Sequence, residues 1–433
     1  MKVNSYDRQI LRIALPAIIT NITIPLLGLV DTTIVGHMGD AAYIGAIAVG
    51  SMMFNLVYWV FGFLRMGTSG LTAQARGRRN REEMVNMLTT SAKTAVAIST
   101  SLLILQIPLC ELLLWFISPT ADVRPLAVTY FYIVVWGAPA VLGLYGLTGW
   151  FIGMQNTRLP MFISILQNIV NILASLTLVY GFGMKVEGVA FGTLIAQYAG
   201  FLLAAGLLWR YYRKLFKNIH HVWRFGSLQS FHTFFRVNRD IFLRTLCLVA
   251  VNLYFTSLGA RQGATILAVN ALLIQLYLLF SYILDGFAYA GEALGGRYWG
   301  AKNDTSFRAV VKRLFGWGAL MTLLFTSAYV IGGMSFLRLL TNEAGVIEAS
   351  GEYIWWACLI PVCGVAAFIW DGIFIGITET RGMLLSSAIA TFLFFVVALL
   401  LIPLWGNHGL WFAMLLYLAT RGIVQTVIYL ERY

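Results

Sequence analysis

An acidic residue inside a long apolar stretch is the feature of this sequence best suited to chemistry. Asp31 lies toward the outer end of the apolar stretch 12–35, six residues after Pro25. A carboxylate placed there can take up and release a proton as part of a functional cycle. Pro25 removes a backbone donor and predicts a kink, and Gly28 adds a second hinge position. We predict a proton-binding group beside bendable backbone, the alternative being that Asp31 only caps the helix.

A polar stripe follows the apolar stretch 160–182, with Asn168, Asn171 and Ser175 at helical spacing. Thr193 and Gln197, in the stretch 188–210, are spaced to face the same cavity. Such residues either line a substrate cavity or link neighbouring helices by hydrogen bonds. Their spacing alone favours the linking role.

Three further acids occur in the second half of the chain. Asp285 and Glu292 lie on one side of the helix expected from residue 264, toward its cytoplasmic end, and Asp371 lies in the apolar stretch 351–375. We expect these acids to be proton or cation coupling groups, or to hold the helices in register. The position of Asp371 before a glycine favours a structural role.

Metal-site and phosphate-loop motifs are absent from the sequence, and its five histidines form no cluster with acids. The sequence therefore predicts no metal site, no cofactor and no enzymatic activity. It also disfavours ATP as an energy source.

The composition predicts an integral membrane protein. The 433 residues are 59% hydrophobic and only 11% charged, with a mean hydropathy of +0.79, far too apolar for a soluble globule. Twelve stretches are long enough to cross a bilayer as helices: 12–35, 42–67, 93–117, 126–152, 160–182, 188–210, 238–259, 264–290, 312–336, 351–375, 383–404 and 409–430.

The net charge of +12 is distributed as in a membrane protein with both termini in the cytoplasm. In that orientation every Lys and Arg faces the cytoplasm except Arg124, Lys185, Arg261 and Arg338. The cations are dispersed over many short loops, so a nucleic-acid partner is disfavoured. The expected partner is the lipid bilayer.

An internal repeat at an offset of 223 residues organises the chain. Residues 149–158 align with residues 372–381, including Gly149 with Gly372 and Gly153 with Gly376, which we interpret as hinges. Six spans per copy give both copies the same orientation, as in parallel-repeat transporters. The predicted domains are a first lobe at 1–209, a cytoplasmic linker at 210–237 and a second lobe at 238–433.

Several motifs are similar to those of one transporter family: Asp31-Thr-Thr-Ile-Val-Gly36, Gly149-Trp-Phe-Ile-Gly153, Leu284-Asp285-Gly286-Phe287-Ala288-Tyr289-Ala290-Gly291-Glu292 and Asp371-Gly372-Ile-Phe-Ile-Gly376. In this order and spacing, the chain resembles the multidrug and toxic-compound extrusion (MATE) family, and in particular its DNA-damage-inducible bacterial branch.

The resemblance implies an all-α fold of two six-helix lobes around a central cleft in the bacterial inner membrane. It implies export of amphipathic, often cationic drugs or toxins in exchange for H⁺ or Na⁺, by a protein that functions as a monomer. The family's functional aspartate corresponds to Asp31 and its asparagine to Asn171, which makes Asn171 a cavity residue. Ser175 replaces an aspartate that many relatives carry, and this loss of a charged oxygen ligand favours H⁺ over Na⁺.

Two rival functions stay open. A lipid-linked saccharide flippase would place several Arg or Lys in its cavity, whereas the mid-span regions here are expected to hold almost no basic residue. A lipid-modifying enzyme would need acids and histidines clustered at one membrane face, and His37, His220, His221, His232 and His408 do not form such a set.

Overall fold

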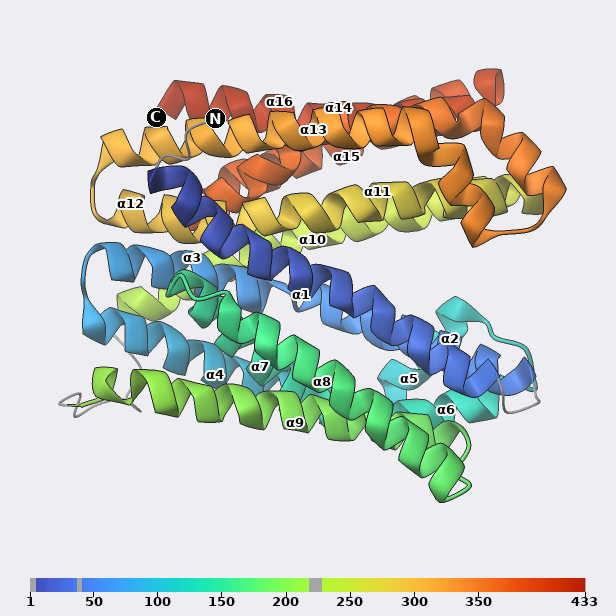
Figure 1. The fold of residues 1–433 in the computed structure, drawn as a ribbon, viewed down its shortest axis with the longest axis horizontal. Helices are drawn as coiled ribbons and strands as arrows, with labels where there is room; N and C mark the ends of the chain where they lie inside the picture. Colours follow the sequence, from blue (N-terminus) through green and yellow to red (C-terminus); the bar gives the residue numbers. More distant parts are fainter. Residues whose placement is uncertain (1–4, 37–40, 218–227, 433) are drawn as a thin grey trace. The chain divides into compact units, whose positions relative to one another are not determined.

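The computed structural model describes residues 5–36, 41–217 and 228–432, and every element in these ranges is helical. Side chains at 24–32, 35–41 and 228–231 lie outside the description. The described chain forms two compact units. One unit comprises Ile19–Asn238, and the other comprises Met1–Ile18 with Arg239–Tyr433. In each unit, the helices run side by side as a bundle (Figure 1).

The unit Ile19–Asn238 contains the second half of α1, the eight helices α2 to α9 and the first turns of α10 (Leu228–Arg261). Their bounds are α1 Ser5–Gly36, α2 Ala41–Val60, α3 Phe63–Gly77, α4 Arg81–Ile104, α5 Gln106–Ile117, α6 Arg124–Val134, α7 Ala138–Gly153, α8 Arg158–Leu176 and α9 Val186–Tyr212. Prolines explain two of the breaks. Leu105 interrupts the helix just before Pro108, and a 3₁₀ turn at Val135–Gly137 precedes Pro139.

The other unit is built around one central helix, α14. Its elements are α10 Leu228–Arg261, α11 Ala264–Ala290, a π-helical turn Gly291–Gly295, α12 Gly296–Gly300, α13 Asp304–Leu340, α14 Ala344–Ile377, α15 Thr380–Trp405 and α16 Asn407–Arg432. In the apolar 18-residue segment of α14, 72% of the residues are buried, whereas the share in the corresponding segment of α13 is 17%. A helix that is apolar on all sides and buried on all sides belongs in the core of the bundle.

The 223-residue repeat is visible in the backbone. Left-handed residues occur at the same offset in both copies, at Arg79 and Lys302, at Gln155 and Thr378, and at Gly183 and Gly406. The helices α4 and α13 both begin after an asparagine cap. Asn80 accepts from the backbone N–H of Glu83 at 3.1 Å, and Asn303 accepts from that of Ser306 at 3.0 Å. The two copies therefore share the geometry of their turns.

The repeated glycines are packing positions in this structure, and their interpretation as hinges stays a prediction. A Cβ atom on Gly149 would lie 2.2 Å from the carbonyl oxygen of Arg65, and one on Gly372 would lie 2.2 Å from that of Ala288. Both glycines sit inside regular helices, α7 and α14. They let two helix backbones touch, as small residues do in membrane bundles.

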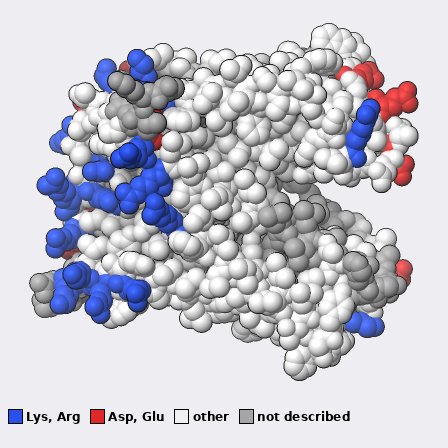
Figure 2. Space-filling view, in the orientation of Figure 1, with Lys and Arg blue, Asp and Glu red and all other residues white. Residues whose placement is uncertain are grey.

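Eleven helical segments of the described residues are long and apolar enough to cross a membrane, and ten of them coincide with predicted spans. The predicted span 93–117 is displaced, because the membrane-length helix is Arg81–Ile104 and the chain breaks at Leu105 before the shorter helix Gln106–Ile117. The first predicted span lies within α1, whose side chains are described only in part. Figure 2 shows Lys and Arg gathered at one end of the helices of each unit, and most Asp and Glu on this face at the opposite end. The all-helical, multi-pass membrane fold is confirmed.

Candidate functional site

In the unit Ile19–Asn238, α8 and α9 bring together a buried polar cluster. Asn171 donates from Nδ2 to the hydroxyl of Thr193 at 3.2 Å. Ser175, one turn further along α8, packs against the backbone of α9 at Gly192, where a Cβ atom would lie 2.2 Å from the Ser175 hydroxyl. Asn171 and Ser175 are both completely buried. The missing side chain at Gly192 makes room for this hydroxyl between the two helices.

Several oxygens of this region have no hydrogen-bond partner. They are Asn171 Oδ1, Ser175 Oγ, Gln197 Oε1 and the Tyr58 hydroxyl, all with buried atoms. Leaving a buried polar atom unpaired costs about 1–3 kcal/mol. Such an oxygen can accept a hydrogen bond from a donor that enters the bundle.

Asn168 lies apart from that cluster, because it faces α1. Its Nδ2 donates to the backbone carbonyl of Thr23 at 3.0 Å, and the Thr23 and Ser164 hydroxyls lie 3.0 Å apart. The polar stripe of α8 thus divides into one row against α1 and another row against α9. Gln197 points toward the 3₁₀ turn, with its Oε1 against Gly137.

The proposed switch lies outside the described side chains. Pro25, Gly28 and Asp31 fall in α1, at positions where only the helical backbone is described. Their predicted roles stay predictions.

The second unit contains a buried ionic cluster centred on Asp371 of α14. Arg244 of α10 and Arg421 of α16 both donate to its Oδ2, and Gln425 donates to its Oδ1 at 2.7 Å. Arg244, Asp371 and Arg421 are 6%, 7% and 2% exposed. Three helices far apart in sequence are thus held together at one carboxylate.

The ionic cluster carries a formal surplus of one positive charge. Two guanidinium groups meet one carboxylate, and the Nε atoms of both Arg244 and Arg421 have no acceptor. The guanidinium of Arg421 also lies 5.5 Å from the ring centre of Tyr417, which partly compensates it by a cation–π contact. Removing the carboxylate would leave two buried cations unpaired, at a cost of several kcal/mol.

The other two predicted acids differ in burial. Ser281 lies 3.5 Å from a carboxylate oxygen of the half-buried Asp285. Glu292 is 1% exposed and lies in the π-helical turn, where its backbone carbonyl approaches Gly376. Such π turns are frequent at functional sites.

Sequence reasoning missed Arg244, Arg421 and Gln425. The expectation of almost no basic residue at mid-span is wrong, because Arg244 and Arg421 are buried within membrane-length helices. Tyr417, Arg421 and Gln425 occur at intervals of four, which is the signal that could have revealed a polar face on α16. The charges also break the repeat, since the positions 223 residues before Arg244, Asp371 and Arg421 hold Asn21, Thr148 and Tyr198.

Among the described residues, no group of three or more His, Cys, Asp or Glu is placed to hold a metal ion. The four cysteines are free.

Two matches to one family model decide the identity of the chain. The MatE family model matches residues 16–177 and again residues 241–400, one match in each copy of the repeat. The chain belongs to the MatE family. It is accordingly a membrane transporter of the multidrug and toxin type, and its two MatE halves have nearly the same length and nearly the offset found in the sequence.

Individual relatives agree with this assignment. The chain is 36% identical over 434 residues to DNA damage-inducible protein F of Escherichia coli, covering 99% of this chain and 93% of that protein. It is 27% identical over 321 residues to a probable multidrug resistance protein NorM of Acinetobacter baylyi, covering 70% and 68% of the two chains.

Solved structures share the MatE fold at low sequence identity. The described chain matches a MATE crystal structure in the bent conformation with a TM-score of 0.88 and 18% identity, covering 99% of this chain and 96% of that one. It matches an outward-facing MATE transporter of the MOP superfamily with a TM-score of 0.84 and 19% identity, with the same coverage.

Proposed function

We propose that this MatE protein is an antiporter that exports amphipathic, often cationic organic compounds in exchange for protons, with Asp31 as the group that protons and substrate both neutralise. The observation that carries the proposal is the set of unpartnered buried oxygens at Asn171, Ser175 and Gln197. All three can accept hydrogen bonds, and both a protonated carboxyl group and an organic ammonium are donors. These acceptors are thus chemically suited to the two species that the exchange requires.

The nature of the polar cluster favours protons over Na⁺. Asn171, Ser175 and Thr193 offer neutral oxygens, and Thr193 is already the acceptor for Asn171. A hard cation binds tightly only where charged oxygens contribute. Ser175, which replaces the second carboxylate that the resemblance leads one to expect, therefore leaves Asp31 as the expected charge of this cavity.

The second unit is proposed to contribute acids of two kinds. Asp285 and Glu292 carry protons toward the cytoplasmic end, whereas Asp371 fixes α10, α14 and α16 through its two arginines and Gln425. Because Asp371 is enclosed by cations, we propose that it acts in coupling by holding the bundle together rather than by exchanging a proton with water.

The remaining features of the proposal concern architecture. The protein is a monomer in a bacterial inner membrane with both termini in the cytoplasm, and its lobes 1–209 and 238–433 alternate access across the linker 210–237. A lipid-linked saccharide flippase is the weaker candidate even with two buried arginines, because Arg244 and Arg421 are engaged by Asp371 and not free for a pyrophosphate.

The test measures the efflux of a fluorescent organic cation from loaded proteoliposomes. We expect transport to follow an imposed pH gradient and to ignore a Na⁺ gradient. Asp31→Asn should abolish it, and Asp31→Glu should retain part of it. Full transport by Asp31→Asn would overturn the switch, and Na⁺-driven transport at zero pH gradient would overturn the coupling ion.

A further inference from the structure

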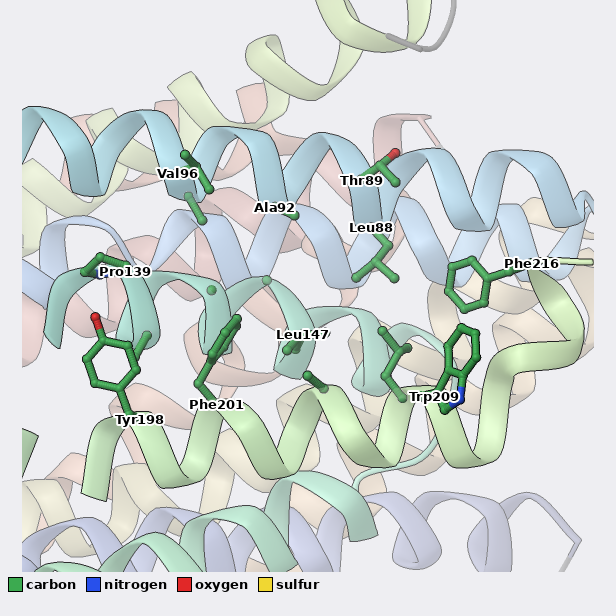
Figure 3. Close-up of a pocket in the computed structure, with 16 residues that line it drawn as sticks. Leu88, Thr89, Ala92, Val96, Pro139, Leu147, Tyr198, Phe201, Trp209 and Phe216 are labelled. Carbon is green, nitrogen blue, oxygen red and sulfur yellow. The ribbon is translucent and has the colours of Figure 1, made fainter. Parts of the chain in front are cut away.

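An apolar hollow of about 560 Å³ lies on the unit Ile19–Asn238, away from the Asn171 cluster. Its floor is α7 and its walls are α4 and α9 (Figure 3). Small residues on α7, such as Ala140 and Gly143, leave space between α4 and α9. The residues of α4 that line this space, Leu88, Ala92 and Val96, occur at intervals of four. The hollow therefore follows the helices lengthwise.

The lining of the hollow is almost entirely apolar. The Thr89 hydroxyl is satisfied by the backbone carbonyls of Val85 and Asn86, and the Tyr198 hydroxyl donates to the carbonyl of Trp136 at 2.8 Å. Apart from the Trp209 indole N–H, the remaining lining side chains are apolar, and Val96 and Trp209 are 63% and 66% exposed. This surface is therefore suited to a hydrocarbon chain.

The length of the hollow matches one leaflet of a bilayer. From Tyr198 to Trp209, α9 rises about 17 Å at 1.5 Å per residue, and half of a hydrocarbon core is about 15 Å. Figure 3 shows Tyr198 and Pro139 at one end, and Trp209 and Phe216 at the other. Trp side chains are typical of the level of lipid headgroups.

Cations are concentrated at the end of the hollow that holds Trp209. Arg210, Arg213, Lys214 and Lys217 lie beside or between the lining residues Trp209 and Phe216, and all four side chains are exposed. Each Lys or Arg near a membrane surface attracts anionic lipid by about 1 kcal/mol. The apolar hollow thus ends beside a group of cations that could bind a phosphate.

From this placement we propose that the α4–α7–α9 hollow is a binding site for one anionic phospholipid, with an acyl chain along α7 and its phosphate among Arg210, Arg213, Lys214 and Lys217. The lining of the hollow includes none of Asn171, Ser175 and Thr193, so this site is distinct from the polar cluster of α8 and α9. It would tie the cytoplasmic end of α9 to the membrane surface.

The test compares phosphatidylglycerol with phosphatidylcholine of identical acyl chains, titrated into the delipidated full chain in nonionic detergent and followed by native mass spectrometry. We expect phosphatidylglycerol to bind at least tenfold more tightly. The double variant Arg213→Gln with Lys214→Gln should bind phosphatidylglycerol roughly tenfold more weakly than the native chain and should bind phosphatidylcholine with unchanged affinity. The matched control, Arg308→Gln with Lys312→Gln, removes two exposed cations from the other unit and should change neither affinity.

A second pair of variants tests the hydrocarbon part. Each of the single variants Ala92→Phe and Ala205→Phe places an aromatic ring in the hollow. Each should weaken the binding of both lipids by fivefold or more. Their melting temperatures without lipid report whether the fold is intact. The proposal would be overturned if the two lipids bound with equal affinity. It would also be overturned if the Ala92→Phe and Ala205→Phe variants bound both lipids as tightly as the native chain, or if water-soluble glycerol phosphate competed at the same concentration.

Discussion

Arg421 of α16 donates a hydrogen bond to the carboxylate of Asp371 on α14, and both side chains are almost fully buried. Arg244 donates to the same oxygen from α10. A single carboxylate therefore links three membrane-spanning helices of one unit. Its replacement should affect stability before it affects transport.

The first prediction concerns this ionic cluster. Asp371→Asn keeps the shape of the side chain but leaves two buried guanidinium groups without a counter-charge, so the protein should lose about 3–5 kcal/mol of stability. Thermal unfolding in detergent measures the loss. Adding Arg421→Gln to Asp371→Asn should recover part of it, because one unpaired charge is then removed. A double variant less stable than Asp371→Asn would contradict the account.

A second prediction separates function from stability at Ser175. Its hydroxyl is buried and unpartnered, so Ser175→Ala removes an unpaired polar atom and should leave the melting temperature unchanged or slightly higher. If the hydroxyl serves substrate or proton, the same change should lower transport several-fold. Ser387→Ala, at another fully buried and unpartnered serine in the other unit, is the control, and its transport should stay near that of the native chain.

The third prediction uses the repeated glycines. Gly149→Ala and Gly372→Ala place a methyl group against a backbone carbonyl that cannot move aside, so each should destabilise its own unit by at least about 1–3 kcal/mol. Gly206→Ala is the matched control, since nothing lies within 4 Å of its Cβ position. That change should stabilise α9 by roughly 0.5–1 kcal/mol. Equal changes in stability from Gly149→Ala and Gly206→Ala would contradict the close backbone contact at Gly149.

Topology gives a fourth prediction. In a chain without native cysteines, Lys185→Cys should react with a membrane-impermeant thiol reagent added to intact cells, and Lys302→Cys should react only after the cells are opened. Lys185 directly precedes α9, and Lys302 lies just ahead of the Asn303 cap of α13. The reverse pattern would place the termini outside.

Much of the fold could be predicted because apolar length and charge distribution are local properties of the sequence. The spans, the repeat and the caps at Asn80 and Asn303 all follow from residue types at fixed spacing. The ionic cluster could not, because the partners of Asp371 come from residues 127 and 50 positions away. Arg244 lies near the start of its stretch, where a basic residue is ordinarily assigned to the surface, and Arg421 lies in the middle of the stretch 409–430 with no partner nearby in sequence. Only packing shows that they turn inward.

The left-handed turns shared by the two copies bear on how the chain enters the membrane. Arg79 and Lys302 have φ values of 57° and 54°, a conformation that costs a side chain about 1 kcal/mol more than it costs glycine. A cation is nevertheless present at both positions. Each cation lies just ahead of a membrane-length helix, α4 or α13, where basic residues favour the cytoplasmic side. We therefore expect glycine at either turn to relieve the local strain and to weaken this preference, giving a protein that folds at least as stably but inserts less uniformly.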